Sequence, residues 1–295
     1  MSSQSEGAGS IYDLGYRHYD GARLGRRHSV LSLYFYTLRG AFGLGRRSSS
    51  KIIPIAISII AFIPALIQLG IAAIASGIVD LIKPENYYGY VQVTVALFCA
   101  AVAPEIVGRD QRTRTLSLYF SRALERRDYA LAKLAAFTTA LLLLTLLPQA
   151  VLFVGNMLAT KDITQFLQDN WRQIPRIIIS GLLIASLMAS LSLAIACQTS
   201  RRSYATVAVI AVFLVTTPLA NIFVREAGGI GHFAILLSPF DLLAGTTGWL
   251  FDARSDREGI VSIADLPMLV YPLMTLAVTA IATALILRRY ARIAA

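Results

Sequence analysis

The run YALAKLAAFTTALLLLTLLPQAVLFVGNMLA, Tyr129–Ala159, decides the fold of this chain. It is longer than the roughly 20 residues that a helix needs to cross the hydrocarbon core of a bilayer. Because that core holds no water, the backbone polar groups must pair within the segment, and a helix achieves this. We therefore predict a membrane-spanning helix here, with a kink at Pro148.

Five further apolar runs lie outward from this one in both directions along the chain. With 56% hydrophobic and 15% charged residues among 295, the composition excludes an ordinary soluble domain. The alternating segments of about ten residues that mark a transmembrane β-barrel are not seen. We predict an all-α integral membrane protein with six transmembrane helices. The other five predicted spans are Ile52–Val79, Tyr90–Val107, Ile174–Gln198, Tyr204–Val224 and Leu266–Leu287.

The lysines and arginines predict how these spans are oriented, because cytoplasmic loops carry an excess of both residues. With the N-terminus inside, 20 of the 27 fall on the cytoplasmic side, in the N-terminal segment, two loops and the tail. An even number of spans then places both termini in the cytoplasm, and we expect a multi-pass protein of the plasma membrane. The net charge of +10 follows from this asymmetry, so no nucleic-acid partner is expected. No apolar run opens the chain, so a cleavable signal peptide is not expected.

The chain divides into a cytoplasmic N-terminal segment, residues 1–50, and a six-helix membrane domain, residues 51–295. Within the first part, residues 28–45 place Val30, Leu33, Tyr34 and Leu38 near one helical face, with arginines on both sides. This pattern is typical of a helix that lies in the membrane interface. The simpler alternative is an extension of the first span.

The external stretch 225–265 contains an apolar part of about span length that is rich in glycine and also holds Pro239. Such helix-breaking residues favour short re-entrant or surface helices over a seventh continuous span. A seventh span would also place the basic tail outside the cell, which the distribution of positive charge disfavours.

Catalytic and nucleotide-binding patterns are not recognisable in this sequence. The stretch Gly43–Lys51 lacks the glycine and the preceding strand of a phosphate-binding loop, and the three histidines are not at metal-ligand spacing. Cys99 and Cys197 lie inside apolar runs, where we expect buried thiols. We therefore expect no enzymatic activity and no cofactor in this chain itself.

A few uncharged polar residues lie deep in the predicted spans, where ionisable residues are nearly absent. They could form hydrogen bonds between helices or line a substrate path. The shortage of buried acids argues against proton coupling and leaves the energy source open. These residues are Gln68, Gln149, Asn156 and Asn221.

The most basic segment of the chain lies between the second and third spans, at 105–128. As a helix, Thr113–Leu124 would place Leu116, Phe120 and Leu124 on one face, directly after a cluster of arginines. Alternatively, this is a loop whose arginines set the topology and bind lipid phosphates.

The run GRDQRTRTLSLYFSR, Gly108–Arg122, with RRDY at Arg126–Tyr129 and Lys133 beyond it, resembles the first cytoplasmic loop of ABC-2 type exporter permeases. Thr115, Leu116, Ser121, Arg127, Asp128 and Lys133 match that family's pattern. Arg114 and Ala132 stand where glycine is usual, and Ala123 stands where proline is usual. Residues 11–26 and Leu237–Asp241 are also similar to segments of such permeases, in the first case of an actinobacterial subgroup.

This resemblance implies a type V exporter-like fold, with an N-terminal elbow helix and six spans that pair with a second permease copy or a paralogue. It also implies two copies of a separate ATP-binding subunit, which hold ATP and Mg²⁺, and contacts with membrane lipids. The 105–128 loop would be the coupling segment that enters a cleft of the ATPase. The coupling residues so implied are Glu105, Arg109, Asp110, Arg112, Arg114, Leu116, Tyr119 and Phe120. The alternatives are an integral membrane lipid-modifying enzyme or assembly factor, or a stand-alone secondary carrier.

Overall fold

A computed structural model describes residues 21, 24–45, 49–74, 84–113, 115–120, 124–160, 162–253 and 259–292. Within these ranges the chain is helical and contains no strand. The long helices are α2 (Ser49–Ile74), α3 (Pro84–Arg112), α5 (Arg126–Ala159), α7 (Gln173–Ala196) and α12 (Val270–Ala291). The shorter elements are α1 (Gly25–Ala41), α4 (Leu116–Phe120), α6 (Ile163–Asn170), α8 (Arg202–Ile210), η1 (Ala211–Val215), α9 (Thr216–Glu226), η2 (Gly229–Leu237), α10 (Pro239–Phe251) and α11 (Ile260–Ala264).

Six helical segments in the described part of the chain are long and apolar enough to cross a membrane, which confirms the predicted multi-pass architecture. The fifth segment, Arg202–Glu226, is built from α8, the π-helical turn η1 and α9. The second is longer than predicted, because α3 continues through the polar residues to Arg112. Positions 75–79 of the first predicted span lie outside the described residues.

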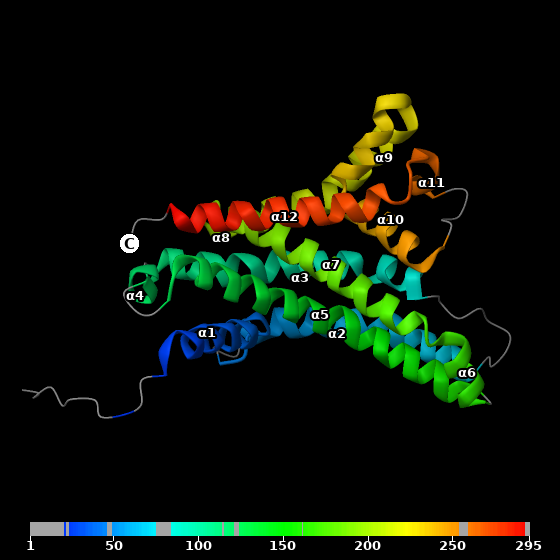
Figure 1. Ribbon diagram of the computed structural model, residues 1–295, viewed down its shortest axis with the longest axis horizontal. Coiled ribbons are helices and arrows are strands. Elements are labelled where there is room, and N and C mark those ends of the chain that lie inside the picture. The colour runs from blue at the N-terminus through cyan, green and yellow to red at the C-terminus, as the bar shows by residue number, and fades with distance from the viewer. Residues whose placement is uncertain are drawn as a thin grey trace, which may run out of the picture.

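The spans form a bundle in which α5 occupies a central position and packs against α1, α2, α3, α7 and α12 (Figure 1). Buried aromatic rings fill the space between helices, and the rings of Phe98 on α3 and Phe137 on α5 stack with centroids 6.4 Å apart. The start of α5, the end of α12 and α4 lie together at the left of Figure 1, and α6 lies at the opposite end. We call these the α4 end and the α6 end of the bundle.

The predicted break in the external stretch is present as the pair η2 and α10, which meet at an angle of 94°. The bend has a local cause. Ser238 caps α10 by accepting a hydrogen bond from the backbone N–H of Asp241, and Pro239 occupies the first turn. The chain enters η2 through Gly228 and Gly229, whose φ angles are +54° and +41°. Glycine adopts such angles at little steric cost, because it has no Cβ atom.

Residues 28–45, predicted to be an interfacial helix, form most of α1, which runs along the first turns of α5. Leu33, Thr37 and Ala41 face the core at helical spacing. Leu31 and Phe35 lie on the outer surface of α1 and are 55% and 54% exposed. The helix therefore has a second apolar face, in addition to the single one that the sequence pattern indicated.

Candidate functional site

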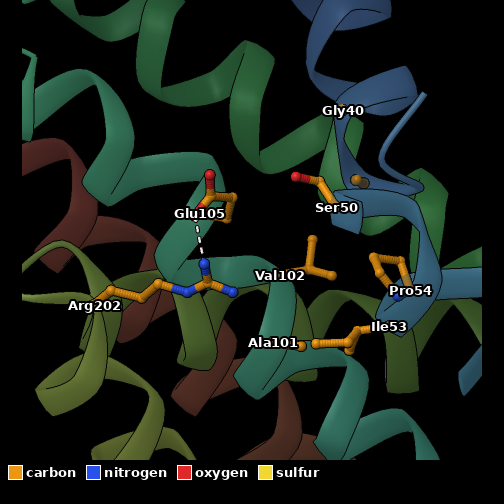
Figure 2. A pocket seen from close by; sticks show the side chains of 9 residues that line it. Gly40, Ser50, Ile53, Pro54, Ala101, Val102, Glu105 and Arg202 are labelled. Carbon is orange, nitrogen blue, oxygen red and sulfur yellow. Dashed lines mark ion pairs between the residues drawn. The ribbon is translucent and has the colours of Figure 1, made fainter. Parts of the chain in front are cut away.

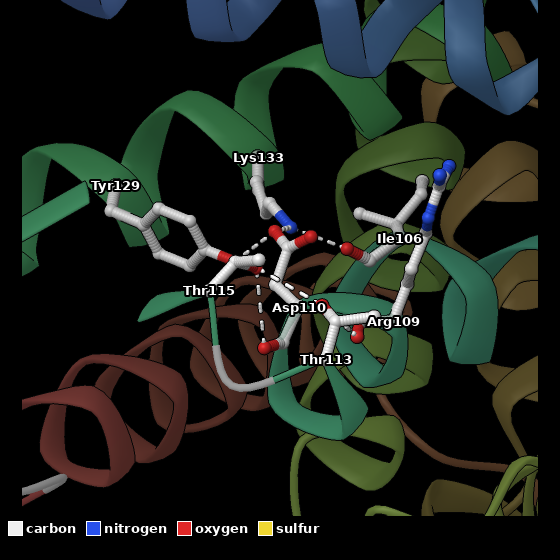
Figure 3. Close-up of polar contacts among 7 residues, drawn as sticks. All are labelled: Ile106, Arg109, Asp110, Thr113, Thr115, Tyr129 and Lys133. Carbon is white, nitrogen blue, oxygen red and sulfur yellow. Dashed lines mark hydrogen bonds and ion pairs between the residues drawn. The ribbon is translucent and has the colours of Figure 1, made fainter. Parts of the chain in front are cut away.

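Three side chains at the α4 end join the end of α3 to the start of α5 (Figure 3). The ammonium group of Lys133 lies 2.5 Å from Oδ2 of Asp110, and it also donates to the backbone carbonyl of Ile106. The hydroxyl of Tyr129 donates to the same carboxylate oxygen at 2.6 Å. The side chain of Lys133 is only 6% exposed and that of Asp110 only 14%. A buried ammonium needs such a partner, because an unpaired charge is costly away from water.

The short helix α4 lies on this cluster through its aromatic side chains. The rings of Tyr119 and Phe120 contact the ring of Tyr129, with centroids 5.6 and 5.8 Å away, and Tyr290 of α12 meets Tyr129 from another side. Burial raises the pKa of Tyr119, and the nearby Asp110 carboxylate raises it further. Leu116 is 8% exposed and belongs to the core of this chain. The helix α4 therefore contacts α5 directly, and Tyr129 of α5 connects it to α12.

Hydrogen bonds from other helices reach the same end of the bundle. Arg26 at the start of α1 donates to both carboxylate oxygens of Asp128, at 2.6 and 2.9 Å, and to Glu125 at 2.5 Å. Arg126 donates to the backbone carbonyl of Ala291 at 3.0 Å and stands over the ring of Phe120. The ends of α1, α3, α5 and α12 are thus connected around the α4 segment.

The remaining residues expected to contact an ATPase lie at different depths. Glu105 is half-buried and forms ion pairs with Arg112 and Arg202, each at 3.5 Å. The side chain of Arg109 is exposed on the last turn of α3. Arg114 lies outside the described residues. Of the described coupling residues, Leu116 is buried, Glu105, Asp110, Tyr119 and Phe120 are half-buried, and Arg109 and Arg112 are exposed.

A groove of 560 Å³ lies between α1 and the α4 segment. Leu33 and Leu124 form its apolar part, and the hydroxyl-bearing residues Ser29, Ser32 and Thr115 are also part of its lining. Tyr36 lies on its α1 side with 58% of its surface exposed. This groove, called the α1–α4 groove below, is a hollow of mixed polarity beside the basic end of α3.

Two of the four polar residues proposed for a substrate path are fully buried. Gln68 of α2 is 4% exposed and Gln149 of α5 is 1% exposed. α2 and α5 pack closely, and a Cβ atom added at Gly155 would lie 2.1 Å from a methyl carbon of Leu69.

Asn156 of α5 belongs to the same region as Gln68, since their neighbours Gly155 and Leu69 are in contact. Its Oδ1 atom is buried and has no hydrogen-bond partner among the described residues. Asn221 lies on α9, which packs against η1, η2, α10 and α11. Asn221 therefore lies in a different helix seam from Gln68 and Asn156, and a shared substrate path stays a prediction.

Other reactive groups in the described ranges do not gather into a second centre. No group of three or more histidine, cysteine, aspartate or glutamate side chains there is arranged to hold a metal ion. Cys99 and Cys197 are buried free thiols, as their apolar surroundings in the sequence predicted.

No protein-family model matches the chain, and no curated protein sequence matches it. What can be said of its function comes from the residues and their arrangement.

Proposed function

We propose that this chain is the membrane-spanning permease subunit of an ATP-driven ABC exporter, and that its 105–128 segment couples it to separate ATPase subunits. The proposal rests on the sequence resemblance of this segment, together with one observation from the structure. The observation is that the aromatic side chains of α4 contact Tyr129 of α5, which in turn contacts Tyr290 of α12 and the Asp110 carboxylate of α3. A force applied to α4 would therefore reach several spans at once.

The surface beside α4 has the chemistry that a protein partner with an acidic rim would recognise. Arg109 is exposed there, and the α1–α4 groove offers a hollow next to it. Complementary charges of this kind orient two proteins and accelerate their association. Tyr119 and Phe120 take the role of transmitting motion to Tyr129, and Leu116 holds the segment on the bundle.

The arrangement of the full transporter follows from the same proposal. Two copies of this chain, or this chain and a paralogue, would form the substrate pathway in the plasma membrane, with both termini in the cytoplasm. The two ATP-binding subunits would hold ATP and Mg²⁺. Closure of the ATPases would then rock the spans and open the pathway outward.

The test is affinity purification of the chain from its native membrane, followed by an ATPase assay of the eluate. A stoichiometric ATP-binding subunit with ATPase activity is expected. Arg109→Glu should remove both the subunit and the activity, because charge reversal at the docking surface weakens association. Arg288→Glu is the matched control, since Arg288 is also exposed at the α4 end but lies on α12. Recovery of the chain without an ATP-binding subunit, or equal loss in both variants, would refute the proposal.

A further inference from the structure

A second hollow, separate from the α1–α4 groove, lies where α2 and α8 begin (Figure 2). Its volume is 250 Å³, and α3 forms its floor. Ser50 and the ion pair of Glu105 with Arg202 form its polar part, and Ile53, Pro54 and Val102 form its apolar part. The membrane-spanning segments of α2 and α8 start at Ser50 and Arg202. The hollow therefore lies at the depth where the headgroups of one bilayer leaflet meet the hydrocarbon.

The charge around this hollow is positive. Glu105 forms ion pairs with two guanidinium groups, those of Arg112 and Arg202, so these three described side chains together carry an excess of one positive charge. Both distances are 3.5 Å, which is long for a charged hydrogen bond, and the Arg202 side chain is 55% exposed. Arg202 can therefore bind a second anion while it keeps its ion pair with Glu105. A guanidinium group binds a phosphate through two parallel hydrogen bonds.

An exposed apolar face of α3 leads away from this hollow. This helix packs against both α2 and α8 and lies between them. Tyr90, Val93 and Leu97 are 59%, 44% and 41% exposed, and they follow one face of α3 toward Ala101 and Glu105. A positive polar pocket at the end of an exposed apolar helix face matches the polarity of a phospholipid, which has a charged headgroup and apolar acyl chains.

We propose that this hollow binds the headgroup phosphate of an anionic phospholipid, whose acyl chains lie on α3 between α2 and α8. Arg202 holds the phosphate, the hydroxyl of Ser50 donates to it, and Leu97 and Val93 contact the acyl chains. A soluble phosphate would use only the pocket, and a second copy of the chain would use only the exposed apolar face of α3. The phospholipid accounts for both parts together. This site does not depend on the proposed transport function.

The experiment is native mass spectrometry of the full-length purified chain in detergent, titrated with phosphatidylglycerol or with phosphatidylcholine. Phosphatidylglycerol is expected to bind more tightly. Arg202→Gln should weaken its binding about fivefold, because one basic residue near a membrane surface contributes about 1 kcal/mol toward an anionic lipid. Arg201→Gln is the matched control, since Arg201 stands over the ring of Tyr204 and does not line the hollow. Equal effects of the two substitutions would refute a defined site.

The Arg202→Gln substitution also removes the ion pair with Glu105. Two further variants therefore test the lipid site without changing this ion pair. Ser50→Asp should weaken phosphatidylglycerol binding by charge repulsion, and Leu97→Trp should weaken it because the larger ring occupies the place of an acyl chain on α3. Glycerol phosphate, which carries the headgroup without acyl chains, should not displace the lipid at millimolar concentration. Displacement by glycerol phosphate would indicate a site for soluble phosphates and would refute the proposal that the hollow binds a phospholipid. If Leu97→Trp changes the fraction of dimer but not the binding of phosphatidylglycerol, the apolar face of α3 is an interface between copies of the chain, and the lipid site is refuted.

Discussion

The ammonium group of Lys133 on α5 lies 2.5 Å from the carboxylate of Asp110 on α3, and both side chains are largely buried. Removing one member of a buried ion pair leaves the other charge uncompensated, which typically costs about 3 kcal/mol or more. Lys133→Met should therefore lower the free energy of unfolding by about 3 kcal/mol. Thermal unfolding of the purified chain in detergent, followed by size-exclusion chromatography, measures this loss.

The double variant Asp110→Asn with Lys133→Met is the control for this pair. Since both charges are gone, part of the lost stability should return, and the two substitutions should be non-additive. If the Lys133→Met chain unfolds at the wild-type temperature, the ion pair does not hold α3 and α5 together.

The hydroxyl of Tyr129 provides the second donor to Asp110, at 2.6 Å, and Tyr129 is fully buried. A hydrogen bond to a charged group contributes about 2 kcal/mol. Tyr129→Phe keeps the ring that Tyr119 and Phe120 contact, so the expected effect is a loss of about 2 kcal/mol with α4 still in place. The same change at the exposed Tyr36 should leave the unfolding temperature unchanged. Equal unfolding temperatures of the Tyr129→Phe and Tyr36→Phe chains would contradict a structural role of this hydrogen bond.

The long apolar spans could be predicted from the sequence because their cause is local. Each run is apolar over about 20 residues, and a helix is the structure that satisfies its backbone in lipid. The bend near Ser238 and Pro239 was also predictable, since capping and helix-breaking residues act on their immediate neighbours. The predicted second span ended at Val107, because the residues that follow are mostly polar. The helix α3 instead continues to Arg112, and Asp110 in this last part contacts Lys133 of α5.

The arrangement of the candidate site could be predicted only in part. Helical periodicity showed that Leu116 and Phe120 share a face, but not that this face meets the chain's own core. The contact of Arg26 with Asp128 joins residues 102 positions apart, and no local pattern indicates it. Similarly, the pattern of residues 28–45 indicated one apolar face of α1, and it did not indicate the second, exposed face with Leu31 and Phe35.

The Arg26 contact leads to a prediction about the mobility of α1. Arg26 is exposed, so its ion pairs with Asp128 and Glu125 contribute little to global stability and weaken in salt. Arg26→Gln should leave the unfolding temperature nearly unchanged but increase amide hydrogen exchange in the first turns of α1. High salt should produce the same increase in the wild-type chain. Arg27→Gln, one position further along the same exposed turn, is the control and should not change the exchange.

Gly245 on α10 lies against the ring of Tyr271 on α12. A Cβ atom added at position 245 would stand 2.3 and 2.4 Å from two ring carbons, and Tyr271 is fully buried, so the ring has no free space to enter. Overpacking of this kind costs about 2 kcal/mol. Gly245→Ala should therefore lower the unfolding temperature in detergent.

Gly248, one turn further along α10, provides the matched control. A Cβ atom there would lie 3.4 Å from the nearest atom, a carbonyl oxygen, which is ordinary contact. Gly248→Ala should be neutral or stabilising, since alanine loses less backbone entropy than glycine in a helix. Adding Tyr271→Leu to the Gly245→Ala chain should make room for the new methyl group, so the two effects should be less than additive. Strict additivity would show that the close contact between α10 and α12 is not what requires glycine at position 245.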